Sequence, residues 1–421
     1  MAVRTLQFLI GAPVVIATGY TGGNSLYHKF DSDNTQLLYI RNEVNQKVVE
    51  NMKTVKKGFA PTPYLPTNPI FQCGMGFLFK FVKGVHYAEE YVKLPDGGQM
   101  KLYWEEEGVK MERPKAIIVV SPGVTGGASS DYIKDFVRRG ADNHFRVVVI
   151  HNRGIEHPLL TPKTHHAGST DDFGLAIDHI KRGNPGVPLF GFGISMGGNM
   201  TLKYVGEKGE DCPYSAVAVV SVPYDITICA EEMARQPIYD KVLTKNFVNG
   251  LLSPNVDIIR KLEKSHGLDI ERGLAAEKTF DYDEAITTKI FGFKTPFDYY
   301  EAVSCKHWLD KIAIPTFCLH SRDDPVCIEG CIPHDKIEKN HNIVMMKTKR
   351  GGHIDFFSGL SPRRWWPDPC IEYFNFMFDH LGLYQGHSEQ LRDSEEELLH
   401  QINHDLPDQT NSAVNHAEAK Q

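Results

Sequence analysis

The chain has 421 residues, which is enough for one large domain or two of ordinary size. Its composition, with 41% hydrophobic and 24% charged residues, is that of a water-soluble globular protein and excludes a multi-span membrane protein. A formal net charge of -7 argues against a nucleic-acid partner, because proteins that bind a phosphate backbone concentrate basic residues on one face.

An apolar stretch at residues 6–20 follows Arg4 and is interrupted by Gly11, Pro13 and Gly19. A membrane-spanning helix needs about 20 apolar residues, so a full span is the weaker interpretation. Residues 1–30 are instead predicted to be a signal-type segment, an anchor on a membrane surface, or an apolar arm packed on the domain. The sequence leaves these alternatives open, and with them the choice between a membrane-associated and a cytoplasmic location.

Short apolar runs alternate with amphipathic stretches over much of the chain. The runs lack polar alternation, as strands covered on both faces do, and they predict strands at residues 116–120, 147–150, 187–192, 216–220, 315–319 and 343–347. Helices are predicted between the first four strands, at residues 131–139, 170–182 and 198–206. This order predicts an α/β fold with a mostly parallel central sheet and helices on both faces. Thr170 is the predicted N-cap of the second helix, with Asp171 and Asp172 in its first turn.

Three further segments complete the predicted organisation. Residues 225–306 are rich in helix-forming, charged and aromatic residues without strand runs, and we interpret them as a helical lid inserted over the sheet. Residues 387–421 are polar and almost free of aromatic residues, which predicts a disordered tail. The main domain is therefore expected over residues 60–385.

The eight cysteines are scattered and form no C-x-x-C pair. We expect free thiols in a reducing compartment. Cys327 and Cys331 have the spacing of neighbours on one helical face, but no matched His or Cys pair accompanies them, so the spacing predicts no zinc site. Neither a metal nor another cofactor is expected.

The segment Gly193-Ile194-Ser195-Met196-Gly197 has the pattern G-x-S-x-G, directly after a predicted strand and directly before a predicted helix. That context is the one a nucleophile elbow requires. The serine would sit at a tight turn, with flanking glycines allowing the strand and the helix to approach closely. Ser195 is therefore the predicted nucleophile.

A serine hydroxyl is a weak nucleophile near neutral pH, so it needs a base, and the base needs an acid that orients it. His353 follows the predicted strand at 343–347, and Asp324 follows the one at 315–319. Both are loop positions at strand ends, where open α/β sheets build their sites. Asp323 competes for the acid role, and we prefer Asp324 because Pro325 stiffens the turn that aims its carboxylate. The chain order Ser, Asp, His is that of the α/β-hydrolase fold.

An oxyanion hole needs two N–H donors aimed at the developing charge. One is predicted to be the N–H of Met196, which follows the nucleophile. The other is predicted to be the N–H of Val124, in the glycine-rich loop at residues 121–127 that follows an earlier strand.

These residues together predict a serine ester hydrolase that forms an acyl-enzyme. The aromatic insertion suggests acyl chains as the bound group, and hence a small-molecule acyl ester or lipid substrate. Two alternatives stay open: an alcohol acyltransferase that uses the same triad, and a non-catalytic lipid carrier. A halide- or epoxide-processing enzyme is disfavoured, because such enzymes need a carboxylate where this chain has Ser195. The oligomeric state is not indicated.

At this point the sequence resembles the YheT-like branch of the α/β-hydrolases, which includes lipases acting on monoacylglycerols and phospholipids. The resemblance runs from about residue 64 to about residue 378. It rests on several motifs in order: residues 122–127, Asn152-Arg153-Gly154, Leu160-Thr161-Pro162, His166-Ala167-Gly168, Thr170-Asp171-Asp172, residues 193–199, Asp323-Asp324-Pro325 and Gly351-Gly352-His353.

The resemblance implies that Ser195, Asp324 and His353 form the catalytic triad, and that the lid ends in a pattern like Phe291-Gly292-Phe293 followed by Asp298-Tyr299-Tyr300. It also implies a membrane contact near the N-terminus. The chain departs from the family in two places: the oxyanion loop begins Pro122-Gly123 where His-Gly is usual, and residues 68–73 replace a segment that usually reads like Gly-His-Leu-Gln-Thr. His166 and Asp171 also form an H-x4-D pattern found in some acyltransferases, although Asp171 is better explained as the start of a helix.

Overall fold

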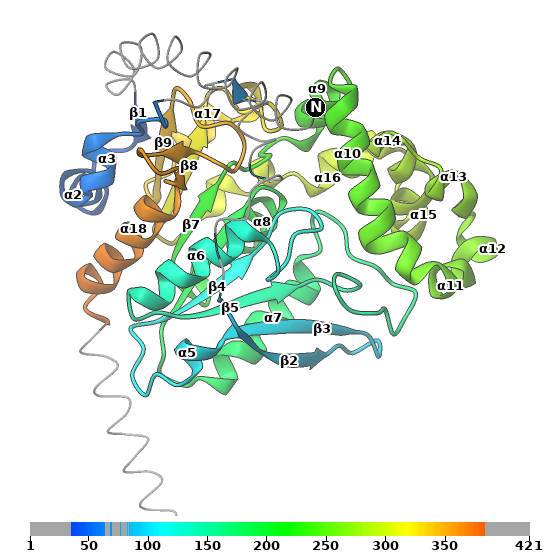
Figure 1. The fold of residues 1–421 in the computed structure, drawn as a ribbon, viewed down its shortest axis with the longest axis horizontal. Helices are drawn as coiled ribbons and strands as arrows, with labels where there is room; N and C mark the ends of the chain where they lie inside the picture. The colour runs from blue at the N-terminus through cyan, green and yellow to red at the C-terminus, as the bar shows by residue number, and fades with distance from the viewer. Residues whose placement is uncertain (1–34, 64–67, 70–75, 77–81, 83, 384–421) are drawn as a thin grey trace, which may run out of the picture.

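The computed structural model describes residues 35–63, 68–69, 76, 82 and 84–383, and its centre is a nine-stranded sheet (Figure 1). The strands of this sheet are β1 (Gln36–Tyr39), β2 (Tyr87–Lys93), β3 (Gln99–Glu105), β4 (Ile117–Ser121), β5 (Arg146–His151), β6 (Leu189–Ile194), β7 (Tyr214–Val220), β8 (Thr316–Ser321) and β9 (Ile343–Thr348). A two-stranded ladder joins β10 (Phe357–Ser358) to β11 (Arg363–Arg364).

The strand order is β1-β9-β8-β7-β6-β4-β5-β3-β2, and the six strands from β9 to β5 are parallel. These are the six strands predicted from apolar runs, with ends that differ by a few residues, and the predicted fold class is confirmed. The sequence analysis missed the edge strands β1 and β2 and the strand β3 beside β2, all of which pair antiparallel with their neighbours. The outermost strand β2 is largely exposed, so it carries no continuous apolar run.

After β4 the chain forms β5, which lies on one side of β4, and then β6, which lies on the other side of β4. The strand order therefore reverses between β4 and β6, and loops that follow these two strands diverge at the carboxyl edge of the sheet. Such a reversal point is where open α/β sheets bind ligands.

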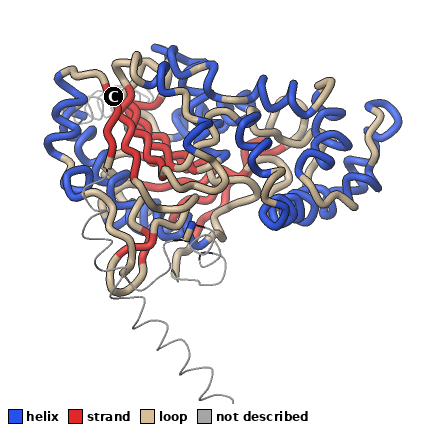
Figure 2. The backbone as a smooth tube through the Cα atoms, turned by 90° about the horizontal axis from the view of Figure 1, so that it is seen from above, coloured by secondary structure: helices blue, strands red, loops and turns tan. Residues whose placement is uncertain are grey.

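Helices cover both faces of the sheet (Figure 2). On one face α6 (Asp131–Asp142), α18 (Pro367–His380) and α2 (Glu43–Asn51) pack against strand residues such as Ile118 and Val120. On the other face α7 (Thr170–Gly183) and α8 (Met196–Lys208) pack against Ile117 and Val119. Alternate residues of one apolar strand thus belong to two different cores. Three shorter helices lie around the sheet, α3 (Lys53–Lys57), α5 (Glu106–Val109) and α17 (His334–Ile337).

The predicted cap of α7 is wrong by one residue. The N-cap is Ser169, and Thr170 is the first helical residue. The Thr170 hydroxyl accepts a hydrogen bond from Lys203 on α8 instead of capping its own helix, because the two helices pack side by side on this face. Asp171 and Asp172 do lie in the first turn, as predicted.

Residues between β7 and β8 form a helical insertion at one end of the sheet, on the right in Figure 1. Its α-helices are α9 (Ile226–Met233), α10 (Pro237–Phe247), α11 (Val256–Ile259), α12 (Glu263–His266), α13 (Ile270–Leu274), α14 (Thr279–Tyr282), α15 (Thr288–Phe291) and α16 (Pro296–Val303), with π-helical turns at Val248–Leu252 and Asp283–Thr287. The insertion has a small core of its own, which includes Leu252, Ile259, Ile270 and Tyr282. Its short helices each bury few residues and depend on that shared core.

The apolar stretch at residues 6–20 and the polar tail at 387–421 lie outside the described residues. Among the described residues, no helix is both long enough and apolar enough to cross a membrane.

Candidate active site

Ser195 lies at the sharp turn between β6 and α8. Its backbone has φ 54° and ψ -124°, a left-handed conformation that costs a non-glycine residue about 1–3 kcal/mol. The Ser195 N–H donates to the carbonyl oxygen of Val220 at 2.9 Å, which fixes the turn to the neighbouring strand. The strained turn is the local geometry that G-x-S-x-G predicts.

The glycines around Ser195 are required by close backbone contacts. A Cβ on Gly197 would overlap the carbonyl oxygen of Ser121 at the end of β4. A Cβ on Gly193 would come within 2.6 Å of the carbonyl oxygen of Gly197, on the other side of the turn. A side chain at either position would therefore push α8 away from the sheet and displace Ser195.

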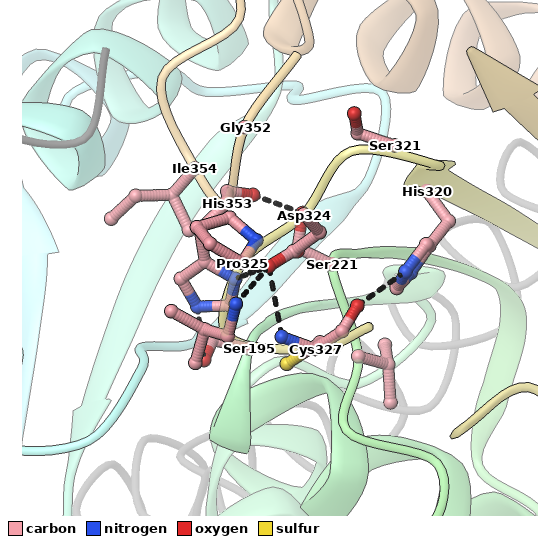
Figure 3. Close-up of polar contacts among 12 residues, drawn as sticks. Ser195, Ser221, His320, Ser321, Asp324, Pro325, Cys327, Gly352, His353 and Ile354 are labelled. Atoms are coloured by element: carbon pink, nitrogen blue, oxygen red, sulfur yellow. Dashed lines mark hydrogen bonds and ion pairs between the residues drawn. The ribbon is translucent and has the colours of Figure 1, made fainter. Parts of the chain in front are cut away.

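The three predicted triad side chains meet at the carboxyl edge of the sheet (Figure 3). The His353 Nε2 atom lies 2.9 Å from Ser195 Oγ, although the two residues are 158 positions apart in the chain. The His353 Nδ1 atom lies 2.8 Å from Asp324 Oδ2 and 3.1 Å from Oδ1. This arrangement can carry a proton from the hydroxyl to the imidazole while the carboxylate holds the ring in place.

The Asp324 carboxylate is held by the loop that follows β8. Its Oδ1 atom accepts the N–H groups of Val326 and Cys327, each at 2.8 Å, and its side chain is fully buried. The neighbouring Asp323 points elsewhere and accepts the N–H of Gly352 at 3.0 Å. Burial raises the pKa of the Asp323 carboxyl above its usual range. The structure thus brings Asp324, and not Asp323, to His353.

The backbone around His353 is shaped by Gly352 and by two residues that the sequence analysis did not single out, Ser221 and Trp366. Gly352 has φ 66°, a left-handed conformation that favours glycine. Ser221, directly after β7, donates its hydroxyl to the carbonyl oxygen of His353. Trp366 donates its indole N–H to the carbonyl oxygen of Ile354 at 2.8 Å. A polar residue at a strand end was the available signal for Ser221, whereas nothing local distinguishes Trp366.

The predicted oxyanion donors Val124 and Met196 both line one cavity, whose lining among the described residues includes neighbours of Ser195 but not Ser195 itself. The loop of Val124 passes so close to Ser195 that a Cβ on Gly123 would lie 3.4 Å from the Cβ of Ser195. The Tyr132 hydroxyl accepts the N–H of Gly123 at 3.2 Å and so supports this loop from α6.

The cavity continues from these residues to the underside of the insertion. It is narrow, with a volume of about 50 Å³. Phe247, Leu251 and Ile286 of the insertion contribute to its lining. Titratable groups also line it, among them His166 and Asp283. Burial lowers the pKa of His166 to about 3, and burial raises the pKa of Asp283 to about 6. The imidazole of His166 packs against the rings of Phe291, Phe293 and Tyr299, which belong to the predicted end of the lid.

Asn199 joins the nucleophile helix to the end of the insertion. Its Nδ2 atom donates to the carbonyl oxygens of Ala167 and Val303, at 3.0 and 2.9 Å. Its Oδ1 atom accepts the N–H of Cys305 at 2.8 Å. Asn199 is fully buried, so all its hydrogen bonds are made inside the protein. The sequence motif contained this residue, but nothing in the motif indicates these distant partners.

The seven cysteines of the described residues are free thiols, and six of them are buried. Cys73 lies outside the described residues.

Comparison with known proteins gives the family. The model of the family described as "Serine aminopeptidase, S33" matches residues 112–332, which contain Ser195 and Asp324. The bovine phospholipase ABHD3 is 31% identical over 287 residues, covering 66% of this chain and 69% of that protein. The Escherichia coli protein YheT is 29% identical over 280 residues, covering 65% of this chain and 80% of that protein. The monoacylglycerol lipase of Saccharomyces cerevisiae is 25% identical over 272 residues, covering 63% of this chain and 60% of that protein. With its mostly parallel sheet and its serine elbow, the chain belongs to the serine hydrolases of the α/β-hydrolase family, in the branch of YheT and ABHD3.

Proposed function

We propose that this protein hydrolyses carboxylic esters of acyl groups, with Ser195, His353 and Asp324 as its catalytic triad. The observation that carries the proposal is the position of the His353 ring, with Nε2 2.9 Å from Ser195 Oγ and Nδ1 2.8 Å from Asp324 Oδ2. Both distances are within hydrogen-bond reach, as a nucleophile, its base and the orienting acid require.

In the first half-reaction, Ser195 Oγ attacks the ester carbonyl and His353 Nε2 takes its proton. The N–H groups of Val124 and Met196 bind the resulting oxyanion. The tetrahedral intermediate then collapses, and the proton passes from His353 to the departing alcohol, which leaves an acyl group on Ser195. Asp324 stays ionised and stabilises the imidazolium that forms between these steps.

In the second half-reaction, His353 takes a proton from water as the water oxygen attacks the acyl-enzyme. The acid departs and Ser195 regains its proton from His353. The oxyanion donors act again in this step, because the same type of charge develops on the same oxygen.

Lipid-like esters are the proposed substrates. The related proteins named above include a phospholipase and a monoacylglycerol lipase, which act on such compounds. The cavity lined by Met196 also has apolar lining from Phe247, Leu251 and Ile286, which is suited to an acyl chain. The cavity is narrow, so a long chain would enter only after the insertion moves outward.

Ser195→Ala should lower the hydrolysis of p-nitrophenyl esters by at least about 1,000-fold while leaving the fold intact, because the attacking oxygen is removed. The measurement is initial rate, together with labelling by a fluorophosphonate probe and circular dichroism. Ser265→Ala is the matched control, since Ser265 is exposed on the insertion. A Ser195→Ala enzyme that hydrolysed esters like the wild type would refute the proposed nucleophile.

Product analysis in the presence of glycerol separates hydrolysis from acyl transfer. Release of free acid alone supports the hydrolase, whereas acylglycerol formation would identify an alcohol acyltransferase that uses the same triad. A folded wild-type protein whose Ser195 resists the fluorophosphonate probe would instead indicate a lipid carrier.

A further inference from the structure

Cys327 places a sulfur ligand beside the base and the acid of the proposed triad. Ligand atoms of Cys327, Asp324 and His353 all lie within 4.8 Å of one another. Figure 3 shows Cys327 close to the Asp324–His353 pair, with its backbone N–H directed at the carboxylate. The sequence analysis treated Cys327 only together with Cys331; Asp324 is three residues away in the same loop, and folding brings His353 to both of them.

These three side chains have the chemistry of a zinc site. Thiolate sulfur, imidazole nitrogen and carboxylate oxygen are the ligands that Zn²⁺ takes in proteins, at bond lengths of about 2.0–2.3 Å. Tetrahedral geometry at those lengths separates the ligand atoms by about 3.3–3.6 Å. The His353 Nδ1 and Asp324 Oδ2 atoms are 2.8 Å apart and the third ligand is within 4.8 Å, so small side-chain movements would close the site.

Charge balance favours a divalent ion over a monovalent one. A thiolate and a carboxylate carry two negative charges, and the imidazole is a neutral donor, so Zn²⁺ makes the group neutral overall. Neutrality matters because Asp324 and Cys327 are buried, where an uncompensated charge is costly. The His353 side chain, 12% exposed, is the ligand through which an ion would enter.

A second layer of contacts supports the sulfur ligand. The thiol of Cys229 on α9 neighbours the thiol of Cys327 and can turn its S–H toward the Cys327 sulfur. Hydrogen bonds to a ligating atom orient it and tune its affinity for the metal. Asp324 is likewise fixed by the two backbone N–H groups that its Oδ1 atom accepts, which leaves Oδ2 to face the ion.

We propose that Asp324, Cys327 and His353 form an inhibitory binding site for Zn²⁺ or a similar thiophilic divalent cation. On binding, the Cys327 thiol releases its proton to solvent and its sulfur bonds to the metal. The metal also takes the place of the proton on His353 Nδ1, and that proton moves to Nε2. A ring that carries a proton on Nε2 cannot accept the Ser195 proton, so the base is lost. The loss of activity rests on the proposed function, whereas metal binding itself does not.

The test uses the full-length protein, stripped of metal with a chelator, and compares each variant with its own metal-free rate. Zinc chloride should lower wild-type hydrolysis of a p-nitrophenyl ester roughly tenfold or more at saturation, and the chelator should restore it. Cys327→Ala keeps the backbone N–H at that position and should weaken zinc inhibition on the order of 100-fold or more. Cys331→Ala is the matched control, because Cys331 is a buried thiol of the same loop that is not one of the three ligands. This variant should be inhibited by zinc as strongly as the wild type.

Cobalt chloride gives a readout that does not depend on activity. The wild type, Ser195→Ala and Cys331→Ala should each show a thiolate-to-cobalt absorption band, and Cys327→Ala should lack it. The proposal is overturned if Cys327→Ala is as zinc-sensitive as the wild type, or if it shows the same cobalt band. A cobalt band that depends on Cys327 in a protein inactive on every ester would leave the metal site standing and refute the proposed function.

Discussion

Asp323 and Asp324 are adjacent in the chain, yet their carboxylates have different tasks in the structure. Asp324 contacts the His353 ring and accepts two backbone N–H groups of its own loop. Asp323 accepts the N–H of Gly352 and bonds to the Ser321 hydroxyl, so it joins the β8 loop to the loop of His353. One aspartate therefore orients the ring directly, and the other positions the backbone that carries it.

Asparagine at the two positions should separate these tasks. Asp324→Asn should lower kcat about 10,000-fold, because the amide favours the wrong imidazole tautomer and cannot stabilise the imidazolium. Asp323→Asn should lower kcat by less than about tenfold, since its effect on the triad is indirect, and should lower thermal stability. Steady-state kinetics and thermal unfolding of both variants provide the measurement. The assignment of the acid would be reversed if Asp323→Asn showed the larger loss of kcat.

At the scale of elements, the helical insertion contains a buried carboxyl in its own core. Asp283 accepts a hydrogen bond from the Tyr300 hydroxyl at 2.7 Å and begins the π-helical turn after α14. Burial raises the pKa of Asp283 from 3.8 to about 6. The folded insertion therefore holds a proton more tightly than the unfolded chain does.

This shift predicts how the stability of the insertion depends on pH. The folded-state pKa is above the unfolded value, so the contribution is full below about pH 4 and is lost as the pH rises through about 6. Relative to Asp283→Asn, the wild type should lose on the order of 3 kcal/mol of stability over that range. Thermal unfolding of both proteins across pH measures the difference, with the exposed Asp281→Asn as control. A difference in stability between the wild type and Asp283→Asn that stays constant across pH would rule out a raised pKa for Asp283.

At the scale of the whole molecule, Asn199 connects three parts that are far apart in the sequence. It lies on the nucleophile helix, and its partners are the loop before α7, the end of α16 and the segment that returns the chain to the sheet. These hydrogen bonds hold the insertion in a fixed position relative to Ser195.

Asn199→Ala should lower the free energy of unfolding by about 2–4 kcal/mol, because it leaves two buried carbonyl groups and one buried N–H without their partner. It should also lower esterase activity more than thermal stability alone explains, since the insertion loses its link to the nucleophile helix. Chemical denaturation and kinetics test this, and Asn51→Ala, at an exposed position on α2, is the control. An unchanged denaturation midpoint for Asn199→Ala would show that the hydrogen bonds of Asn199 contribute nothing to the free energy of unfolding.

The parallel core of the fold could be predicted because its strands are buried on both faces and so consist of unbroken apolar runs. The elbow at Ser195 could be predicted because its glycines are required by close backbone contacts. Gly193 meets the carbonyl oxygen of Gly197 in the same turn, and Gly197 meets that of Ser121 at the end of the adjacent strand. The strands β2 and β3 could not be predicted in this way. β2 is largely exposed, and β3, although mostly buried, mixes charged residues such as Lys101 with apolar ones, so neither strand has an unbroken apolar run. The predicted N-cap of α7 was wrong by one residue because the Thr170 hydroxyl accepts a hydrogen bond from Lys203 on the neighbouring helix α8.

The sequence by itself determined the α/β fold class, the position of the strained turn at Ser195 and the strand ends that carry His353 and Asp324, because these depend on periodicity and short-range spacing. The sequence favoured Asp324 over Asp323 through Pro325, and the tertiary structure shows the Asp324 carboxylate against the His353 ring. The tertiary structure alone revealed that Ser221 and Tyr132 support the site and that Cys327 lies beside the pair. The contacts of His353 with Ser221 and Asp324 join residues separated by long stretches of chain, and those of Tyr132 and Cys327, although short-range, depend on the path of a loop. Neither kind of contact leaves a recognisable local pattern in the sequence.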